Sequence, residues 1–291
     1  MPTFQTPDPI SVDLEVGVGD VGIEASARAD TIVDVRPTDP TKHADVTAAE
    51  QTRVDHTYGH LSVKGPGGWR RWRPRRSGSI EVEIQLPAGS RVHAEVGVAA
   101  IRCSGRLGEF VAKVGVGDVS LDETGAVHLK TGAGDIALER ATGKVDVVTG
   151  SGGVRLGRVH GPAVVKNSNG DTWIGEVTGE ARVSAANGKI SIDRANEGIV
   201  AKTANGDVRI GEIARGAAVA QSAFGEIEVG VREGVAAWLD LHTRFGEVRN
   251  DMDASEDPGR SEDTVEVRAT TSYGNIAVHH SFASRAGSDA S

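Results

Sequence analysis

A motif of glycine, aspartate and an aliphatic residue recurs along this chain and carries the side chains best placed to do chemistry. Its aspartates are Asp118, Asp135, Asp171 and Asp207. Carboxylates stacked from several copies could bind a hard cation such as Ca²⁺, which prefers several oxygen ligands. Calcium-binding β-rolls carry aspartate in both halves of each coil, whereas one half of this repeat lacks it. We therefore expect the aspartates to favour turns, and we predict no metal site.

Three asparagines, Asn169, Asn187 and Asn205, stand at the same position of equally spaced repeats. Stacked amide side chains can pass hydrogen bonds from one repeat to the next. We interpret this column as a structural ladder and not as a binding site.

The nine histidines are scattered and form no recognisable catalytic spacing. The sequence contains no nucleophile elbow, no phosphate-binding loop and no HExxH zinc motif. Hexapeptide acyltransferases build coils of similar length, but their aliphatic period, counted from Ile136, fails here at Thr142 and His160. We predict that the protein is not an enzyme and has no catalytic residue and no cofactor. An unrecognised hydrolase, which would need paired carboxylates in a groove, is the remaining catalytic alternative.

One short segment has the composition of a binding site. It contains two tryptophans and five arginines: Trp69, Arg70, Arg71, Trp72, Arg73, Arg75 and Arg76. Guanidinium groups and indole rings could together bind phosphate, an anionic lipid or an acidic protein surface. The alternative is a solvated hairpin loop whose arginines pair with the acidic remainder of the protein. Glycine, proline and serine on both sides mark the segment as an excursion from the regular structure.

The elements that position these residues follow from an 18-residue repeat, visible at 143–160, 161–178 and 179–196. Aliphatic residues occupy fixed columns, as at Val147, Val165 and Val183. Within each repeat the apolar positions alternate with polar ones, which is the period of a β-strand. A unit this short cannot hold a helical crossover, so each coil must pair with the next one.

We therefore predict an all-β fold, a single-stranded parallel β-helix (β-solenoid) with about 18 residues per coil and a right-handed winding. The predicted parts are an N-terminal strand and cap region (1–89) with a basic loop (65–79), a regular solenoid (90–250), an acidic loop (251–263), a final coil (264–280) and a disordered tail (281–291).

Composition limits the partners and the compartment. A net charge of −9 makes nucleic acid and anionic membranes unfavourable partners. The N-terminal residues lack the basic and apolar regions of a signal peptide, and no apolar run is long enough to span a membrane. The single cysteine, Cys103, is expected to be a small buried hydrophobic residue. These features predict a cytoplasmic protein.

Three segments carry a resemblance to a known family. Residues 86–92 (LPAGSRV), followed by the serial glycine–aspartate corners, resemble the DUF4097 family. Residues 239–250 (LDLHTRFGEVRN) and 264–274 (TVEVRATTSYG) look like its actinobacterial branch. The resemblance extends from about Ser11 to His280. It implies a β-strand-repeat fold of the kind labelled adhesin and no established reaction.

The function that we predict is that of a non-enzymatic structural or protein-interaction module. We expect an unknown protein partner, and homo-oligomers are possible. One alternative is a self-assembling scaffold similar to bactofilins, which would need terminal coils with apolar, uncovered edges. The other alternative is an adhesin or glycan-binding protein.

Overall fold

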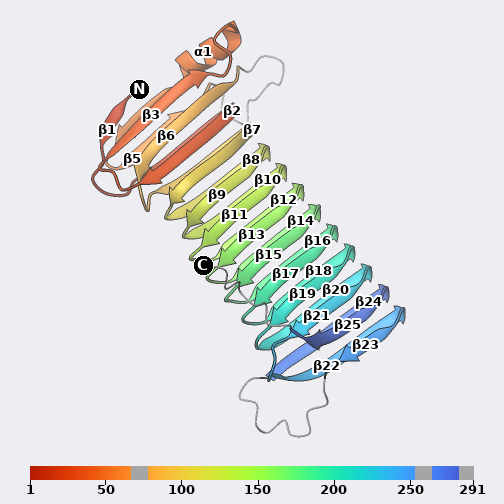
Figure 1. Ribbon diagram of the computed structural model, residues 1–291. Helices are drawn as coiled ribbons and strands as arrows, with labels where there is room; N and C mark the ends of the chain where they lie inside the picture. The colour runs from red at the N-terminus through yellow and green to blue at the C-terminus, as the bar shows by residue number, and fades with distance from the viewer. Residues whose placement is uncertain (67–77, 253–263, 282–291) are drawn as a thin grey trace, which may run out of the picture. The chain divides into compact units, whose positions relative to one another are not determined.

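In the computed structural model the described residues are 1–66, 78–252 and 264–281, and most of them lie in strands. They fall into two compact units, residues 1–170 and 171–291. Within each unit, a strand pairs in parallel with the equivalent strand of the next coil (Figure 1). Both units are therefore β-solenoids, as the repeat predicts.

The regular coils of the first unit use two columns of short strands. The strands are β7 (Arg91–Arg106), β8 (Glu109–Val116), β9 (Val119–Thr124), β10 (Ala126–Ala133), β11 (Ile136–Ala141), β12 (Val145–Ser151), β13 (Val154–Val159) and β14 (Ala163–Asn169). One column runs through β7, β8, β10, β12 and β14, and the other through β7, β9, β11 and β13. Val147 lies opposite Val165, both fully buried, which confirms the predicted aliphatic column.

The N-terminal end of the first unit departs from this order. Its elements are β1 (Thr3–Gln5), β2 (Ser11–Ser26), β3 (Asp30–Pro37), α1 (His43–Gln51), β4 (Arg53–Thr57), β5 (His60–Lys64) and β6 (Ile80–Pro87). Strand β2 pairs in parallel with β7 on one side and with β5 and β6 on the other. A coil therefore begins at Ser11, inside the predicted N-terminal strand and cap region. It lies between the coil of β7 and the coil formed by β5 and β6.

The outermost coil of this end is covered. Strand β3 pairs antiparallel with β6 and with β1, and β4 pairs antiparallel with β5. Helix α1 packs against β3 and β6. Its buried Asp45 accepts hydrogen bonds from the backbone N–H groups of Ser79 (2.9 Å) and Asp39 (3.2 Å). Leu61 and Val63, which point into the end coil, are consequently fully buried.

The second unit continues the same architecture. Its strands are β15 (Thr172–Val177), β16 (Ala181–Asn187), β17 (Ile190–Ala195), β18 (Ile199–Asn205), β19 (Val208–Ile213), β20 (Gly216–Phe224), β21 (Ile227–Val231), β22 (Ala236–Phe245), β23 (Val248–Asp251), β24 (Thr264–Tyr273) and β25 (Ile276–His280). Strand β24 lies between β20 and β22, and β25 lies between β21 and β23 (Figure 1). The coil predicted as the final one, 264–280, is thus last in the sequence but not in space, because β22 and β23 lie outside it.

Buried polar side chains hold the corners between the two columns. Thr203 Oγ1 donates a hydrogen bond to the carbonyl oxygen of Gly188 (3.2 Å), and Ser222 Oγ donates to that of Gly206 (2.9 Å). These glycines have a positive φ, and a Cβ at Gly206 would collide with the Gly188 carbonyl. Glycine is required here because the chain turns in a conformation, and at a distance, that no side chain tolerates.

Helix α1, at nine residues, is too short to cross a membrane. The described part of the chain contains no helix that is both long enough and apolar enough to do so.

Candidate functional site

The basic segment predicted to bind an anionic partner lies outside the described residues. It comprises Trp69, Arg70, Arg71, Trp72, Arg73, Arg75 and Arg76. Its role stays a prediction.

The corner aspartates act as structural hydrogen-bond acceptors. Asp135 Oδ1 accepts the backbone N–H of Gly153 (2.7 Å), and Asp207 Oδ1 accepts that of Glu226 (2.9 Å). Asp118 and Asp171 make the same bond to the following coil. Within the described ranges, no three His, Cys, Asp or Glu side chains gather closely enough to hold a metal ion. Each carboxylate thus orients the corner of the next coil.

The asparagine column forms the predicted ladder in the second unit, where Asn205 Nδ2 donates to Asn187 Oδ1 at 2.9 Å. In the first unit, Asn169 Nδ2 instead donates to the carbonyl oxygen of Gly150 (3.3 Å). Asn167, two residues before Asn169 on the same strand, is buried, and its Nδ2 donates hydrogen bonds to the carbonyl oxygens of Gly152 and Gly170. These amides satisfy backbone groups and neighbouring amides.

Cys103 is buried, as predicted. Burial raises the pKa of its thiol to about 12. A thiol with this pKa stays protonated at neutral pH and is a poor nucleophile.

A charged cluster surrounds Glu212 on β19. Its carboxylate accepts hydrogen bonds from Arg232 Nη2 (2.7 Å) and Ser281 Oγ (3.0 Å), and Arg194 Nε lies 3.5 Å away. Burial raises the pKa of the Glu212 carboxyl, but the bonds from Arg232 and Ser281 outweigh burial and lower the pKa overall. The cluster anchors the end of β25 to β19, so its arrangement is structural.

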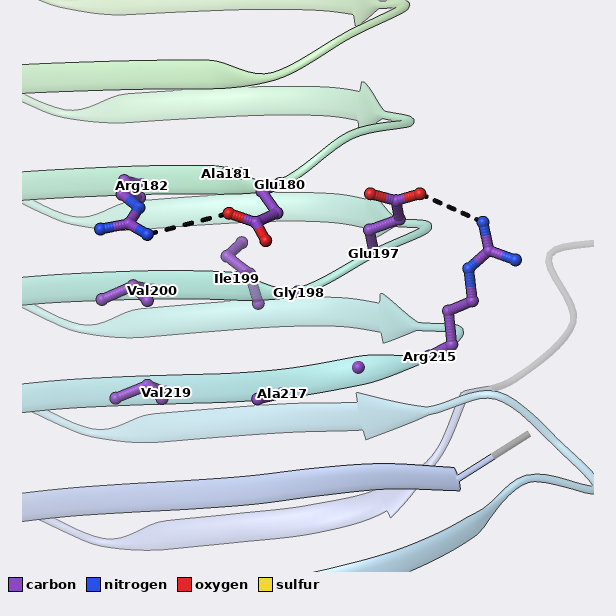
Figure 2. A pocket seen from close by; sticks show the side chains of 11 residues that line it. Glu180, Ala181, Arg182, Glu197, Gly198, Ile199, Val200, Arg215, Ala217 and Val219 are labelled. Carbon is purple, nitrogen blue, oxygen red and sulfur yellow. Dashed lines mark hydrogen bonds and ion pairs between the residues drawn. The ribbon is translucent and has the colours of Figure 1, made fainter.

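A shallow groove crosses β16, β18 and β20, with a volume of about 420 Å³. Figure 2 shows its two ion pairs, Glu180 with Arg182 (3.8 Å) and Glu197 with Arg215 (3.2 Å). Ile199 lies between the two pairs, and Val200 and Val219 lie below Arg182 in this view. The rim carries two carboxylates and two guanidinium groups, so the groove presents no net charge to a ligand.

A stripe of aromatic rings in the second unit is the clearest candidate for recognition. Phe224, Tyr273 and Phe245, which we call the aromatic stripe, occupy the corner column that holds Asn187 and Asn205 in the earlier coils. Phe224 and Tyr273 stack with ring centroids 4.9 Å apart, and Tyr273 and Phe245 with centroids 4.8 Å apart. The three residues are 54%, 48% and 56% exposed.

The sequence pattern does not reveal the aromatic stripe, because the order of its three residues along the chain differs from their order in the folded protein. Each ring precedes a corner glycine, in Phe224-Gly225, Phe245-Gly246 and Tyr273-Gly274. That shared dipeptide is a usable signal. It could not reveal the stacking, because Tyr273 lies between Phe224 and Phe245 only as a result of the inserted β24.

The outermost coil adds further exposed apolar groups beside the stripe. Trp238 on β22 is 60% exposed, with the Arg268 guanidinium 6.0 Å from its ring centroid. Leu239 and Leu241 point into the coil opposite the buried Val267 and Ala269, yet both are only half-buried. The end coil therefore presents apolar side chains that interior coils bury.

The chain is similar to one known family and to several solved structures. The family model Toastrack DUF4097 matches residues 10–289. No curated protein matches the chain. A solved structure described as a "putative adhesin" from Parabacteroides merdae ATCC 43184 is 12% identical, with a TM-score of 0.47 and coverage of 95% of this chain and 94% of that chain. Another with that description, from Bacteroides fragilis NCTC 9343, is 11% identical, with a TM-score of 0.39 and coverage of 95% of each chain.

The family match spans nearly the whole chain and agrees with the motifs and with the stacked coils. The protein therefore belongs to the Toastrack DUF4097 family.

Proposed function

We propose that this protein is a non-enzymatic β-solenoid module that binds a protein partner through the aromatic stripe. The observation that carries the proposal is the stacked and exposed set of Phe224, Tyr273 and Phe245. Aromatic side chains are enriched among the residues that contribute most to protein–protein binding. They are also costly to leave in water, so an exposed row of them supports an interaction surface.

The chemistry of the stripe favours a protein over a glycan. Tyr273 has a ring stacked on each of its faces, so it offers mainly its edge to a partner. Ring edges carry partial positive charge and attract carbonyl oxygens or the faces of other aromatic rings. Sugar rings, in contrast, pack on exposed aromatic faces. Both faces of Tyr273 are occupied by this stacking, and the Arg244 guanidinium lies 5.9 Å from the centroid of Phe245. The adhesin or glycan-binding alternative therefore has less support from the stripe.

The charged side chains around Glu212 and Glu228 bond to one another, and we assign them a structural role. Glu212 is held by Arg232 and Ser281, and His279 Nε2 lies 3.1 Å from Glu228 Oε1. These interactions connect neighbouring coils. The cytoplasmic location likewise stays a prediction, which cell fractionation can test.

The experiment compares two sets of substitutions in the same column. Phe224→Ser, Tyr273→Ser and Phe245→Ser together remove the rings, while Asn187→Ser and Asn205→Ser form the matched control. Both proteins are used as bait in the native cell extract, and captured proteins are quantified by mass spectrometry. We expect a partner that is retained by the wild type and the control and lost by the ring variant. Equal capture by all three proteins would show that the stripe is not the recognition surface.

A further inference from the structure

The outermost coil of the second unit has an open backbone edge. In the described part of the chain, β22 pairs with β24 alone and β23 pairs with β25 alone. The N–H and C=O groups on their outer side can therefore bond to another strand. The side chains that point into this coil are also uncovered: Leu239 and Leu241 are half-buried, and Val248 is 45% exposed.

The order of side chains along β22 is self-complementary. Its outward residues are Trp238, Asp240, His242 and Arg244, arranged symmetrically around Leu241. If a second β22 lies antiparallel with Leu241 opposite Leu241, then Asp240 faces His242 of the second copy. Trp238 then faces Arg244 of the second copy. A carboxylate opposite an imidazole N–H can accept a hydrogen bond, and polar and cation–π pairs across strands stabilise a sheet.

From this arrangement we infer that two copies of the chain associate through the open edge of β22, in an antiparallel pairing centred on Leu241. A twofold axis normal to the sheet keeps the interior of both coils on the same side. The apolar side chains of one end coil then cover those of the other. The same patch is used by both copies, so the interface is isologous and closes at two copies.

The other end of the chain does not offer an equivalent surface. Its outermost coil, β5 and β6, is paired with the antiparallel strands β4 and β3. Leu61 and Val63 in that coil are fully buried. A head-to-tail filament would need an open coil at both ends, so the structure favours a dimer over the bactofilin-like scaffold. This inference does not depend on the proposed partner of the aromatic stripe.

The first test is the mass of the full-length chain in solution. Sedimentation velocity over a wide concentration range should show a reversible transition from 30.3 kDa to twice that mass. A single 30.3 kDa species at every concentration overturns the inference, and so do particles that keep growing as concentration rises.

The second test places a cysteine at the symmetry point. Leu241→Cys brings two Cα atoms to about 5 Å across an antiparallel pair, within the range of a disulfide. Thr270→Cys is the matched control on β24, where the two copies would be roughly 14 Å apart across three strand spacings. Cys103 is buried and its thiol is protonated, so it should not form a disulfide under these conditions. Mild oxidation should link the Leu241→Cys chains and not the Thr270→Cys chains; equal linking of both, or of neither, contradicts the pairing.

The third test uses the charge order and leaves the core unchanged. Asp240→Lys replaces the carboxylate that faces His242 of the second copy with a cation, and it should weaken the dimer by about tenfold. The exchange of Asp240→His with His242→Asp keeps the pairs complementary and should restore wild-type association. A single substitution without effect, or an exchange that fails to restore the dimer, argues against the register centred on Leu241.

Discussion

The outermost coil of the first unit and that of the second unit are built from the same kind of strand but are covered to different extents. In the first unit, β5 and β6 are covered by antiparallel strands, and the inward Leu61 is fully buried. In the second unit, β22 and β23 each have a neighbour on one side within the described residues, and the inward Leu241 is half-buried. A solenoid end therefore needs a cover, and where the described residues supply none the end coil keeps an open edge that can pair with another strand.

The largest expected difference comes from the same truncation at both ends. Leu61→Ala removes a fully buried side chain and should lower the free energy of unfolding by about 2–5 kcal/mol, because it leaves a cavity. Leu241→Ala should cost about 1 kcal/mol in the monomer, since water already reaches the site. Urea unfolding at a protein concentration low enough for monomers measures both. Equal losses would show that the two ends are covered alike.

A smaller effect is expected from the cover of the first unit. Asp45→Ala removes the acceptor of the backbone N–H groups of Ser79 and Asp39. Two partly buried donors lose their partner, so stability should fall by about 2 kcal/mol. Asp45→Asn keeps one acceptor oxygen and should lose less. Thermal unfolding of the two variants gives the order, and an order opposite to this one would remove Asp45 as the anchor of the cover.

Substituting a threonine that bonds to a corner carbonyl compares the stability of an interior coil with that of the end coil. Thr271 Oγ1 donates to the carbonyl oxygen of Gly225 (3.1 Å) and is buried, whereas Thr243 Oγ1 donates to that of Gly274 (2.8 Å) in the half-buried end coil. Thr271→Val should cost about 1–2 kcal/mol because the carbonyl loses its donor away from water. Thr243→Val should cost less than half of that value. Denaturant midpoints of the two variants test the ranking, which reverses if the end coil is the better covered one.

The smallest effect is a dependence on pH. The pKa of Glu212 is lower in the folded protein than its usual value of 4.5, so folding favours the ionised form. The stabilisation is present above the pKa of the unfolded chain and is lost as pH falls through the folded pKa. Glu212→Gln should therefore lower stability at neutral pH by less than about 1 kcal/mol and have less effect near pH ~3. A variant whose deficit grows on acidification would contradict this sign.

The coils could be predicted from the sequence because they depend on local periodicity. The 18-residue period places Val147 opposite Val165, and the corner glycines mark where each coil turns. The neighbours of each coil could not be predicted, because that choice is made by long-range pairing. Strand β2 also carries the glycine–aspartate–aliphatic motif, at Gly19-Asp20-Val21. This segment pairs with both β6 and β7, and no local pattern near residue 20 specifies this.

The candidate site was hidden for the same reason. The aromatic stripe needs β24 to lie between β20 and β22, so its rings are adjacent only in the folded chain. The exposure of Leu241 has a similar origin. Its alternation with polar residues is that of any buried coil, and only the absence of a further strand beyond β22 in the described residues leaves it uncovered.

Hydrogen–deuterium exchange of the monomer tests most directly whether β22 and β23 form the open end coil and whether the coil of β24 and β25 lies inside it. Half of the β22 amides face the open edge, so peptides from residues 236–251 should exchange much faster than peptides from 264–280. The order is informative because 264–280 is the last coil of the sequence and would exchange first if the coils were stacked in sequence order. Faster exchange of 264–280, or equal protection of the two segments, would contradict the account.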